Sequence, residues 1–467
     1  MKTKKRRVEY FSFYNHTGIE QHLSEMAKKG WLIESISNLY WTYRKIEPHD
    51  IHFCVTYYPR ASDFDPEPSE DQQTFHDFCS HTGWQVACTW HQMQVFYNEK
   101  ESPIPLETDP IMEVDTLHRA CKKNFLPSYY LLLALGLLMG GYFIARIPFD
   151  PIGLLSSSSQ LISGLAYLCL FAISLVELVT YFLWHRKAKR AAQDGIFVDT
   201  PSTTRFQHFI LLILLFGMIY WLTNLFAADD PLLLWVAVFM FVYIFGVIFI
   251  VNGIKHGLKK IKASRGVNKA LTLAACFILP TIMTSIIVYV GISAAQNNWT
   301  HKDPFDDSVI PLSVTDFQDV DKDKYIEQNR NNETFLVGQR VVHLFGDWNI
   351  EGTHELPDLQ YTITTVKAPF LYEWCKEQMF LDMDESEDTD IPVGHRLVLK
   401  KQDPAPWKAI EVYRLYHEEG WYMNRYLLCY EDKIIDIRLD WEPTTDDMAI
   451  VNQKLNPLGS LSLFFED

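Results

Sequence analysis

Long apolar runs in the middle of the chain dominate its hydrophobic pattern. Five of them have at least 20 residues each, at positions 126–147, 161–184, 206–227, 232–253 and 270–291. A helix of that length crosses the roughly 30 Å hydrocarbon core of a bilayer, and a helix satisfies its own backbone hydrogen bonds there. The pattern predicts five transmembrane helices within residues 111–294, in contact with the lipid bilayer. Because five is odd, we expect the two chain ends on opposite sides.

Residues 1–110, before these runs, contain a repeated pattern. A helix-like segment ends at Gly30-Trp31 and leads into two alternating, strand-like stretches, and Gly83-Trp84 holds the same place in a second unit. Gly30 and Gly83 stand where a helix often ends in a left-handed residue, which glycine adopts cheaply. Another alternating stretch lies between the units, at 51–58. The pattern predicts an α+β domain whose two helix-Gly-Trp-strand-strand units share one sheet, with helices on one face.

Residues 300–467, after the last run, alternate again between apolar and polar positions. Strands are expected at 335–342, 361–366 and 396–399, a hairpin at 422–430 and 433–441, and helices at 370–380 and 445–455. This pattern predicts a second α+β domain with much sheet.

Charge orients the predicted helices, because basic segments stay on the cytoplasmic side. Fourteen Lys and Arg residues flank the runs on the side of the N-terminus, against two, Arg146 and Lys302, on the other. The fold class expected is therefore a five-helix transmembrane bundle in the cell membrane, with an N-terminal cytosolic α+β domain and a C-terminal extracytoplasmic α+β domain. The formal charge of −16 lies entirely in the outer part, a surface that repels nucleic acid, so no direct nucleic-acid binding is expected.

The N-terminal residues also carry a family resemblance. The run from Glu9 to Phe13, the segment from Leu23 to Trp31, the strand end Tyr57-Tyr58-Pro59 and Gly83-Trp84 resemble the bacterial family called domain of unknown function 2812, over residues 7 to about 120. The resemblance implies a cytosolic domain tethered to membrane helices, in proteins thought to accompany PadR-like transcription regulators. It implies no catalytic residues.

Glu177 is the one acidic residue well inside a predicted span. A carboxylate in the membrane is costly and usually faces the protein interior or a water path, and His208 and Asn252 lie at the same depth as expected partners. A functional role and a purely structural hydrogen bond both fit. In the first span, Gly136 and Gly140 form a GxxxG match, which favours close helix packing within one chain or between two.

The positions of cysteine and histidine residues raise two further questions, a disulfide in the outer part and a zinc site in the N-terminal domain. Cys375 and Cys429 both lie in the outer part, where an oxidising compartment permits a disulfide, but the sequence does not show that they are neighbours, so the pairing stays open. The N-terminal domain contains five potential zinc ligands, His76, Cys79, His81, Cys88 and His91. Their spacing does not fit the usual zinc ligand pairs, so no metal or cofactor is predicted.

No catalytic motif accompanies this architecture: GxGxxG, the P-loop, HExxH, GxSxG and an SxxK pair are missing from the sequence. We therefore do not expect an enzyme. The favoured hypothesis is a signalling or regulatory relay, in which the outer domain receives a signal and the cytosolic domain binds a protein, such as a transcription regulator. A transport-related protein or accessory subunit is the alternative that Glu177 suggests, and an envelope scaffold is the third.

Overall fold

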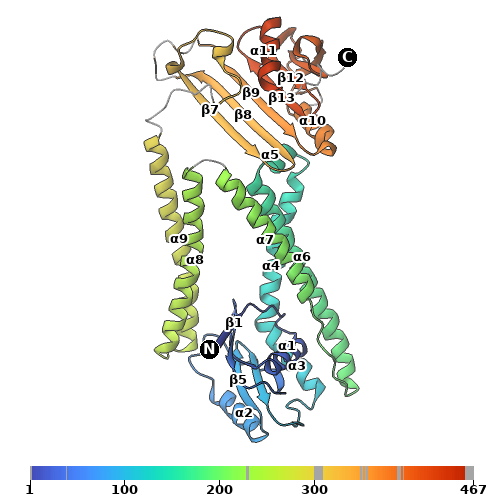
Figure 1. Ribbon diagram of the computed structural model, residues 1–467, viewed down its shortest axis with the longest axis vertical. Coiled ribbons are helices and arrows are strands. Elements are labelled where there is room, and N and C mark those ends of the chain that lie inside the picture. Colours follow the sequence, from blue (N-terminus) through green and yellow to red (C-terminus); the bar gives the residue numbers. More distant parts are fainter. Residues whose placement is uncertain are drawn as a thin grey trace. The chain divides into compact units, whose positions relative to one another are not determined.

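The computed structural model describes residues 3–37, 39–227, 231–298, 309–347, 350, 353, 356–386, 391–392 and 394–457. The chain forms two compact units, each with its own sheets and helices (Figure 1). Unit 1 combines Met1–Gly141 with Leu165–Val290, and unit 2 combines Tyr142–Gly164 with Gly291–Asp467. The two predicted α+β regions are both sheet-containing, and five helices between them are long and apolar enough to cross a membrane.

The N-terminal domain is built twice from the same strand-helix-strand-strand unit. The first consists of β1 (Lys4–Arg7), α1 (His16–Lys28), β2 (Trp31–Ile36) and β3 (Trp41–Lys45), and the second of β4 (His52–Tyr57), α2 (Glu70–His81), β5 (Gln85–Trp90) and β6 (Met93–Asn98). Each makes its own antiparallel sheet, in the orders β1-β3-β2 and β4-β6-β5. The expected single shared sheet is therefore wrong, because the first strand of each unit pairs within its own unit.

The two units agree in backbone detail. The φ angle is 79° at Gly30 and 92° at Gly83, where α1 and α2 end. The next strand then carries a bulge at the same step, between Ile33 and Ser35 in β2 and between Val86 and Cys88 in β5. A bulge inserts one unpaired residue and bends its strand, so the repeat extends to the curvature of the sheets.

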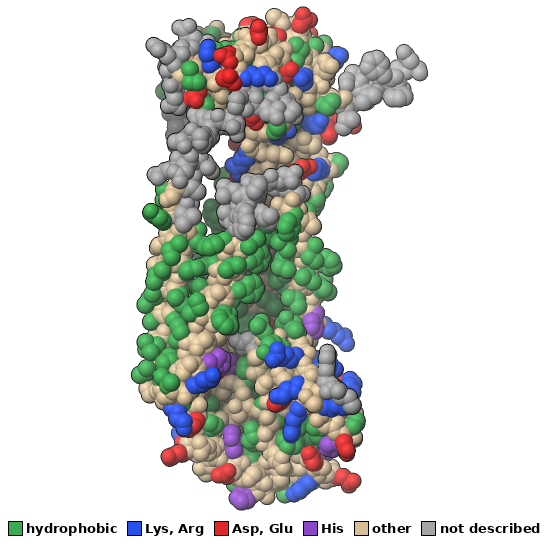
Figure 2. Space-filling view, turned by 60° about the vertical axis from the view of Figure 1, so that its left-hand side comes forward, with side chains coloured by type: hydrophobic (Ala, Val, Ile, Leu, Met, Phe, Trp, Pro, Cys, Tyr) green, Lys and Arg blue, Asp and Glu red, His purple; other side chains and the backbone are tan. Residues whose placement is uncertain are grey.

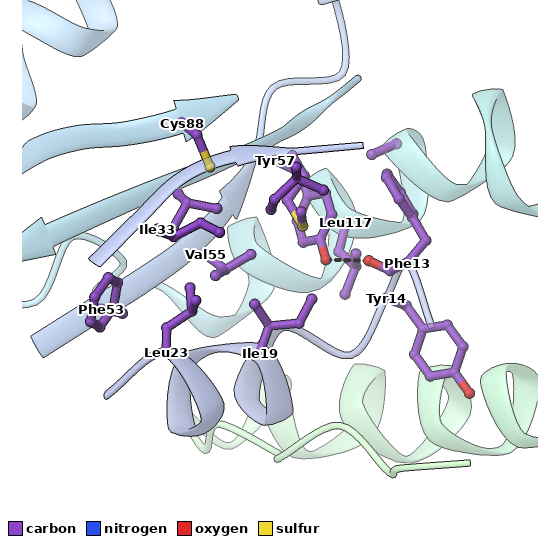
Figure 3. Packing of buried hydrophobic residues seen from close by; sticks show 14 of the residues in the cluster. Phe13, Tyr14, Ile19, Leu23, Ile33, Phe53, Val55, Tyr57, Cys88 and Leu117 are labelled. Atoms are coloured by element: carbon purple, nitrogen blue, oxygen red, sulfur yellow. Dashed lines mark hydrogen bonds between the residues drawn. The ribbon is translucent and has the colours of Figure 1, made fainter. Parts of the chain in front are cut away.

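A single apolar core joins both sheets to α1 and to helices that come after the second sheet in the chain. Ile19, Leu23 and Met26 lie on one face of α1, at the helical spacing, and are buried. Figure 3 shows Ile19 and Leu23 directed toward Val55 of β4. The domain also includes α3 (Pro110–Lys123), whose buried face completes the core with residues such as Val114, Leu117 and Ala120. The domain therefore extends beyond residue 110, the limit expected from the sequence, and includes a helix that was not expected.

The apolar runs form α4 (Phe125–Arg146), α6 (Ser158–Gln193), α7 (Thr204–Ala227), α8 (Pro231–Lys260) and α9 (Arg265–Asn298). Several extend past the predicted apolar limits, α6 by nine residues at its end, because polar residues continue the helix beyond the apolar stretch. Hydrophobic side chains cover the surface of these helices, and Lys and Arg gather near the N-terminal domain (Figure 2). This distribution is compatible with helices that cross a membrane.

The C-terminal domain is one seven-stranded antiparallel sheet in the order β10-β11-β12-β13-β9-β8-β7. Its strands are β7 (Tyr325–Glu333), β8 (Val337–Gly346), β9 (Leu359–Val366), β10 (Leu397–Gln402), β11 (Glu411–His417), β12 (Trp421–Cys429) and β13 (Lys433–Leu439). Five of these strands were predicted from the sequence, and β7 and β11 were not. The first of these is an edge strand whose middle is polar, so its apolar alternation is weak.

Both faces of this sheet are covered. The helix α11 (Thr445–Leu455) packs on one face through Val451 and Leu455, and α10 (Tyr372–Leu381) packs on the other through Cys375 and Met379. A short helix between α4 and α6, α5 (Pro151–Ser156), joins the second face through Ile152. The turn that connects two of the apolar helices is thus part of the C-terminal domain's core.

Candidate functional site

Glu177 is completely buried in α6 and is held by hydrogen bonds from the start of α7. The side-chain amide of Gln207 donates to Glu177 Oε1 at 2.8 Å, and the hydroxyl of Thr203 donates to the same oxygen. The expected partners, His208 and Asn252, are wrong: His208 lies against the ring of Tyr10, and the Asn252 amide donates to its own helix at Ile248 O.

The N-terminal domain reaches this carboxylate through the loop that precedes α1. Ser12 Oγ lies 3.0 Å from Thr203 Oγ1 and accepts a hydrogen bond from the Gln207 amide at 3.1 Å. Ser12 is itself buried. One cluster of side chains therefore ties together three segments, namely α6, the start of α7 and the loop before α1, and we call it the Glu177 junction, made of Ser12, Glu177, Thr203 and Gln207.

Further hydrogen bonds join the α6–α7 connection to the start of α1. Thr200 N donates to Thr17 Oγ1 at 2.9 Å, and the Thr200 hydroxyl donates to Asn15 Oδ1 at 3.0 Å. Asn15 also caps α1 by accepting from Gly18 N. Since buried polar groups left without a partner cost about 1–3 kcal/mol each, these reciprocal bonds hold the loop and the connection in one arrangement.

Aromatic side chains surround the same loop. The Tyr14 ring lies with its centroid 5.3 Å from those of Phe125 in α4 and Tyr181 in α6. Tyr14 is fully buried, and aromatic pairs at this separation add to the free energy gained from burial. The loop before α1 is consequently packed into the helices as well as hydrogen-bonded to them.

A second contact joins the N-terminal domain to the connection between α8 and α9. The Asp63 carboxylate binds Lys255 Nζ at 2.6 Å and Lys259 Nζ at 3.1 Å, and Asn268 donates to Phe64 O at 3.2 Å. Burial acts to raise the pKa of Asp63, but the Lys255 hydrogen bond and the nearby positive charges outweigh it and lower the pKa overall. The basic α8–α9 connection thus contacts the loop that contains Asp63 and Phe64 directly.

The sequence contains a signal for the Glu177 junction that lies outside the spans. Hydroxyl residues cluster immediately before the third apolar run, at Thr200, Ser202, Thr203 and Thr204. Thr203 and Gln207 are one helical turn apart, so they share a face where α7 begins. The partners expected for Glu177 included His208, the neighbour of Gln207 in the third run, and no residue before that run, so both Thr203 and Gln207 were missed.

Cys375 and Cys429 are brought into one apolar cluster, between α10 and β12. Both are free thiols, so the disulfide considered above is not formed in this structure. Burial raises the pKa of both thiols to about 11. Since the thiolate is the reactive form, burial makes both sulfurs slow to oxidise.

Comparison with known proteins identifies the N-terminal domain. Residues 15–129 match the sequence model of the family described as Protein of unknown function (DUF2812). These residues are a DUF2812 domain. The match confirms the resemblance and covers α1 to α3 with the first residues of α4, whereas Glu177 lies outside it. A search of curated proteins and a search of solved structures each returned no match.

Proposed function

We propose that this protein is a multi-pass membrane protein that acts as a regulatory relay. The C-terminal domain receives a signal on the outer side, α4, α6 and α7 transmit it, and the DUF2812 domain presents the response to a cytosolic protein. The Glu177 junction carries this proposal, because it fixes the loop before α1, which leads into the DUF2812 domain, to two apolar helices through side chains that are hydrogen-bonded to one another.

The ends of α4 and α6 that lie in unit 2 also support the proposal. In unit 2 the turn between α4 and α6 is anchored to the C-terminal sheet: the Thr334 hydroxyl donates to Leu155 O at 2.6 Å, and the Gln378 amide donates to Phe149 O at 3.3 Å. Packed helices with anchored ends transmit a displacement when they have two discrete arrangements. A shift of the turn on the sheet would therefore act on α6, the helix that carries Glu177.

The direction and the partner follow from charge and from the family resemblance. Basic residues flank the helices on the side of the DUF2812 domain, which favours the cytosol for that domain and the outer side for the acidic C-terminal domain. Families of this kind are thought to accompany transcription regulators, so a regulator is the partner we propose. Two hydrogen bonds to Glu177 Oε1 support a role in assembly. Transport is kept as the second candidate, because Glu177 Oε2 is buried without a hydrogen-bond partner among the described residues.

Hydrogen exchange in lipid nanodiscs tests the relay. Thr334→Val removes the hydroxyl that binds Leu155 O, and Thr334→Ser keeps it. We expect the valine variant to speed the exchange of amides around Thr200 by several-fold, because the junction loosens, and the serine variant to behave as wild type. If Thr334→Val alters exchange only within the C-terminal sheet, the two domains are not coupled and the relay is wrong.

The partner is tested separately by crosslinking from intact membranes. The relay predicts that a transcription regulator is captured by the full-length protein, and that Glu177→Leu weakens its capture while Glu177→Gln does not. Recovery of equal amounts of regulator with all three chains would mean that the junction does not control partner binding.

A further inference from the structure

The DUF2812 domain contains a cavity of about 430 Å³ that is separate from the Glu177 junction. Its polar lining includes His16, Thr17 and Glu20 from α1, His52 from β4, and Glu107 and Glu113 from the segment before α3 and from α3 itself. The α6–α7 connection adds a wall through Phe197, Val198 and Asp199. A volume of this size lies in the range of about 300–1,000 Å³ that small-molecule sites occupy.

The acidic groups are fixed by the protein rather than left free. Glu20 Oε1 accepts a hydrogen bond from Val55 N at 2.7 Å, and the Thr56 hydroxyl donates to Glu107. Both donors belong to β4, an edge strand whose outer side faces no other strand of its sheet. The edge strand thus positions two carboxylates at one cavity.

Two histidines, His16 and His52, line the cavity beside these carboxylates, and His52 is exposed. His16 is buried. Its Nε2 lies 2.8 Å from Glu113 Oε1. The residue is only 7% exposed, and its Nδ1 has no hydrogen-bond partner among the described residues. Even with both histidines protonated, the ionised carboxylates of Glu20, Glu107, Glu113 and Asp199 leave the cavity lining with a net negative charge.

Ionised carboxylates cost free energy in this cavity, because they are partly removed from solvent. Desolvation raises the pKa of Glu20, whereas the charge of His16 and the hydrogen bond from Val55 lower it. Desolvation is the larger effect, and the resulting pKa is about 7. The pKa of Glu107 is raised as well, by burial first and then by Glu113. A cation in the cavity would relieve this cost, since an opposite charge within a few ångströms favours the ionised carboxylate.

The remaining lining indicates which kind of cation fits. Phe53, Trp84 and Phe197 line the same cavity, and the Trp84 indole is held by its N–H, which donates to Ile104 O at 2.8 Å. Aromatic rings combined with carboxylates are typical of sites for organic ammonium ions. In the described part of the chain no three His, Cys, Asp or Glu side chains converge in a way that would hold a metal ion.

We propose that this cavity binds a small organic cation with one or more protonated amines, and that Glu20 and Glu107 are its counter-charges. This binding site does not depend on the proposed relay, because both counter-charges lie within the DUF2812 domain.

Calorimetry on the full-length protein in detergent tests the site, with 1,4-diaminobutane and phenethylamine as cationic probes at pH 8. At least one amine is expected to bind saturably, and neutral 1,4-butanediol is not. The double variant Glu20→Gln, Glu107→Gln should lose at least about tenfold in affinity. The matched control is Glu25→Gln, Glu101→Gln, which makes the same charge change at two exposed positions of α1 and of the segment before α3, and it should bind as wild type.

Several results would overturn the proposal. These are no saturable binding of either amine, equal binding of the diol, and equal loss in both double variants, which would indicate diffuse attraction by surface charge. Displacement of the bound amine by micromolar Mg²⁺, Ca²⁺ or Mn²⁺ would show a metal site instead. Thermal unfolding of each variant separates a lost site from a lost fold, and the Glu20, Glu107 variant is expected to be at least as stable as wild type.

Discussion

Glu20 and Glu177 are carboxylates removed from solvent in different surroundings. Glu177 Oε1 accepts from both a hydroxyl and an amide, so the carboxylate organises its neighbours. Glu20 shares its cavity with three further carboxylates and two imidazoles, those of His16 and His52. The first residue is therefore expected to stabilise the protein through its hydrogen bonds, and the second to destabilise it whenever it is ionised.

Replacing Glu20 by glutamine should stabilise the protein at high pH and not at low pH. The pKa of Glu20 is raised from 4.5 to about 7 in the folded state, so the stability linked to its protonated form is complete below pH 4.5 and is lost as the pH rises through 7. The glutamine side chain cannot ionise, and it keeps an acceptor for Val55 N. We expect a gain of up to about 3 kcal/mol at pH 8 that disappears near pH 4.

Thermal unfolding of wild type and Glu20→Gln at a series of pH values between these limits measures this effect. Glu25→Gln, at an exposed position of the same helix, is the control and should show no such dependence. A stabilisation that is equal at both pH extremes would contradict the assignment to ionisation of Glu20.

At Glu177 the choice of substitution decides the outcome. Glu177→Gln retains an oxygen that accepts from Thr203 and Gln207, whereas Glu177→Leu removes it and leaves the buried Thr203 hydroxyl and the half-buried Gln207 amide without that partner. We expect the leucine variant to be less stable than the glutamine variant by about 1–3 kcal/mol. Unfolding temperatures in one detergent compare the two, and equal values would show that these hydrogen bonds contribute nothing to stability.

At the scale of elements, glycines determine how closely α4 and α6 pack. A Cβ atom added at Gly136 would lie 2.6 Å from the backbone nitrogen of Phe171, and one at Gly140 would lie 3.1 Å from a Leu168 methyl group. The GxxxG match therefore serves packing within one chain. Gly141, the next residue, has no atom within 4 Å of its added Cβ.

This difference predicts opposite effects of the same substitution on one helix. Gly136→Ala should destabilise the protein, because the backbone of α6 has to move, and Gly140→Ala should have a smaller effect, because a leucine side chain adjusts. Gly141→Ala should be neutral or stabilising by up to about 1 kcal/mol, since alanine favours helix over glycine. Unfolding temperatures of the three variants give the order, and equal effects at Gly136 and Gly141 would contradict close packing of α4 on α6.

At the scale of the whole molecule, five apolar helices lie in the sequence between two domains of unlike charge. The proposed orientation predicts that a fluorescent protein fused before residue 1 is fluorescent in a bacterial host, and that alkaline phosphatase fused after residue 467 is active, since that enzyme needs an oxidising compartment. Exchange of the two reporters should abolish both signals. An active N-terminal phosphatase fusion would reverse the orientation and, with it, the direction of the relay.

The sequence by itself determined the features that depend on neighbouring residues. Run length predicted the five long helices, and alternation predicted most strands of both domains, because periodicity is a property of the local chain. Glycine followed by tryptophan marked the ends of α1 and α2 for the same reason. The polar middle of β7 is an exception, where an edge strand needs little apolar alternation.

The tertiary structure decided everything that depends on distant residues meeting. Ser12 and Thr203 are separated by 191 positions and yet lie 3.0 Å apart, so no local pattern relates them, and the partners expected for Glu177 were wrong. The two separate sheets and the acidic cavity arise in the same way, from strand pairing and from helices that pack over β4. Burial then gives Glu20 and Glu177 their properties, because a carboxylate's free energy depends on what surrounds it and not on its neighbours in the sequence.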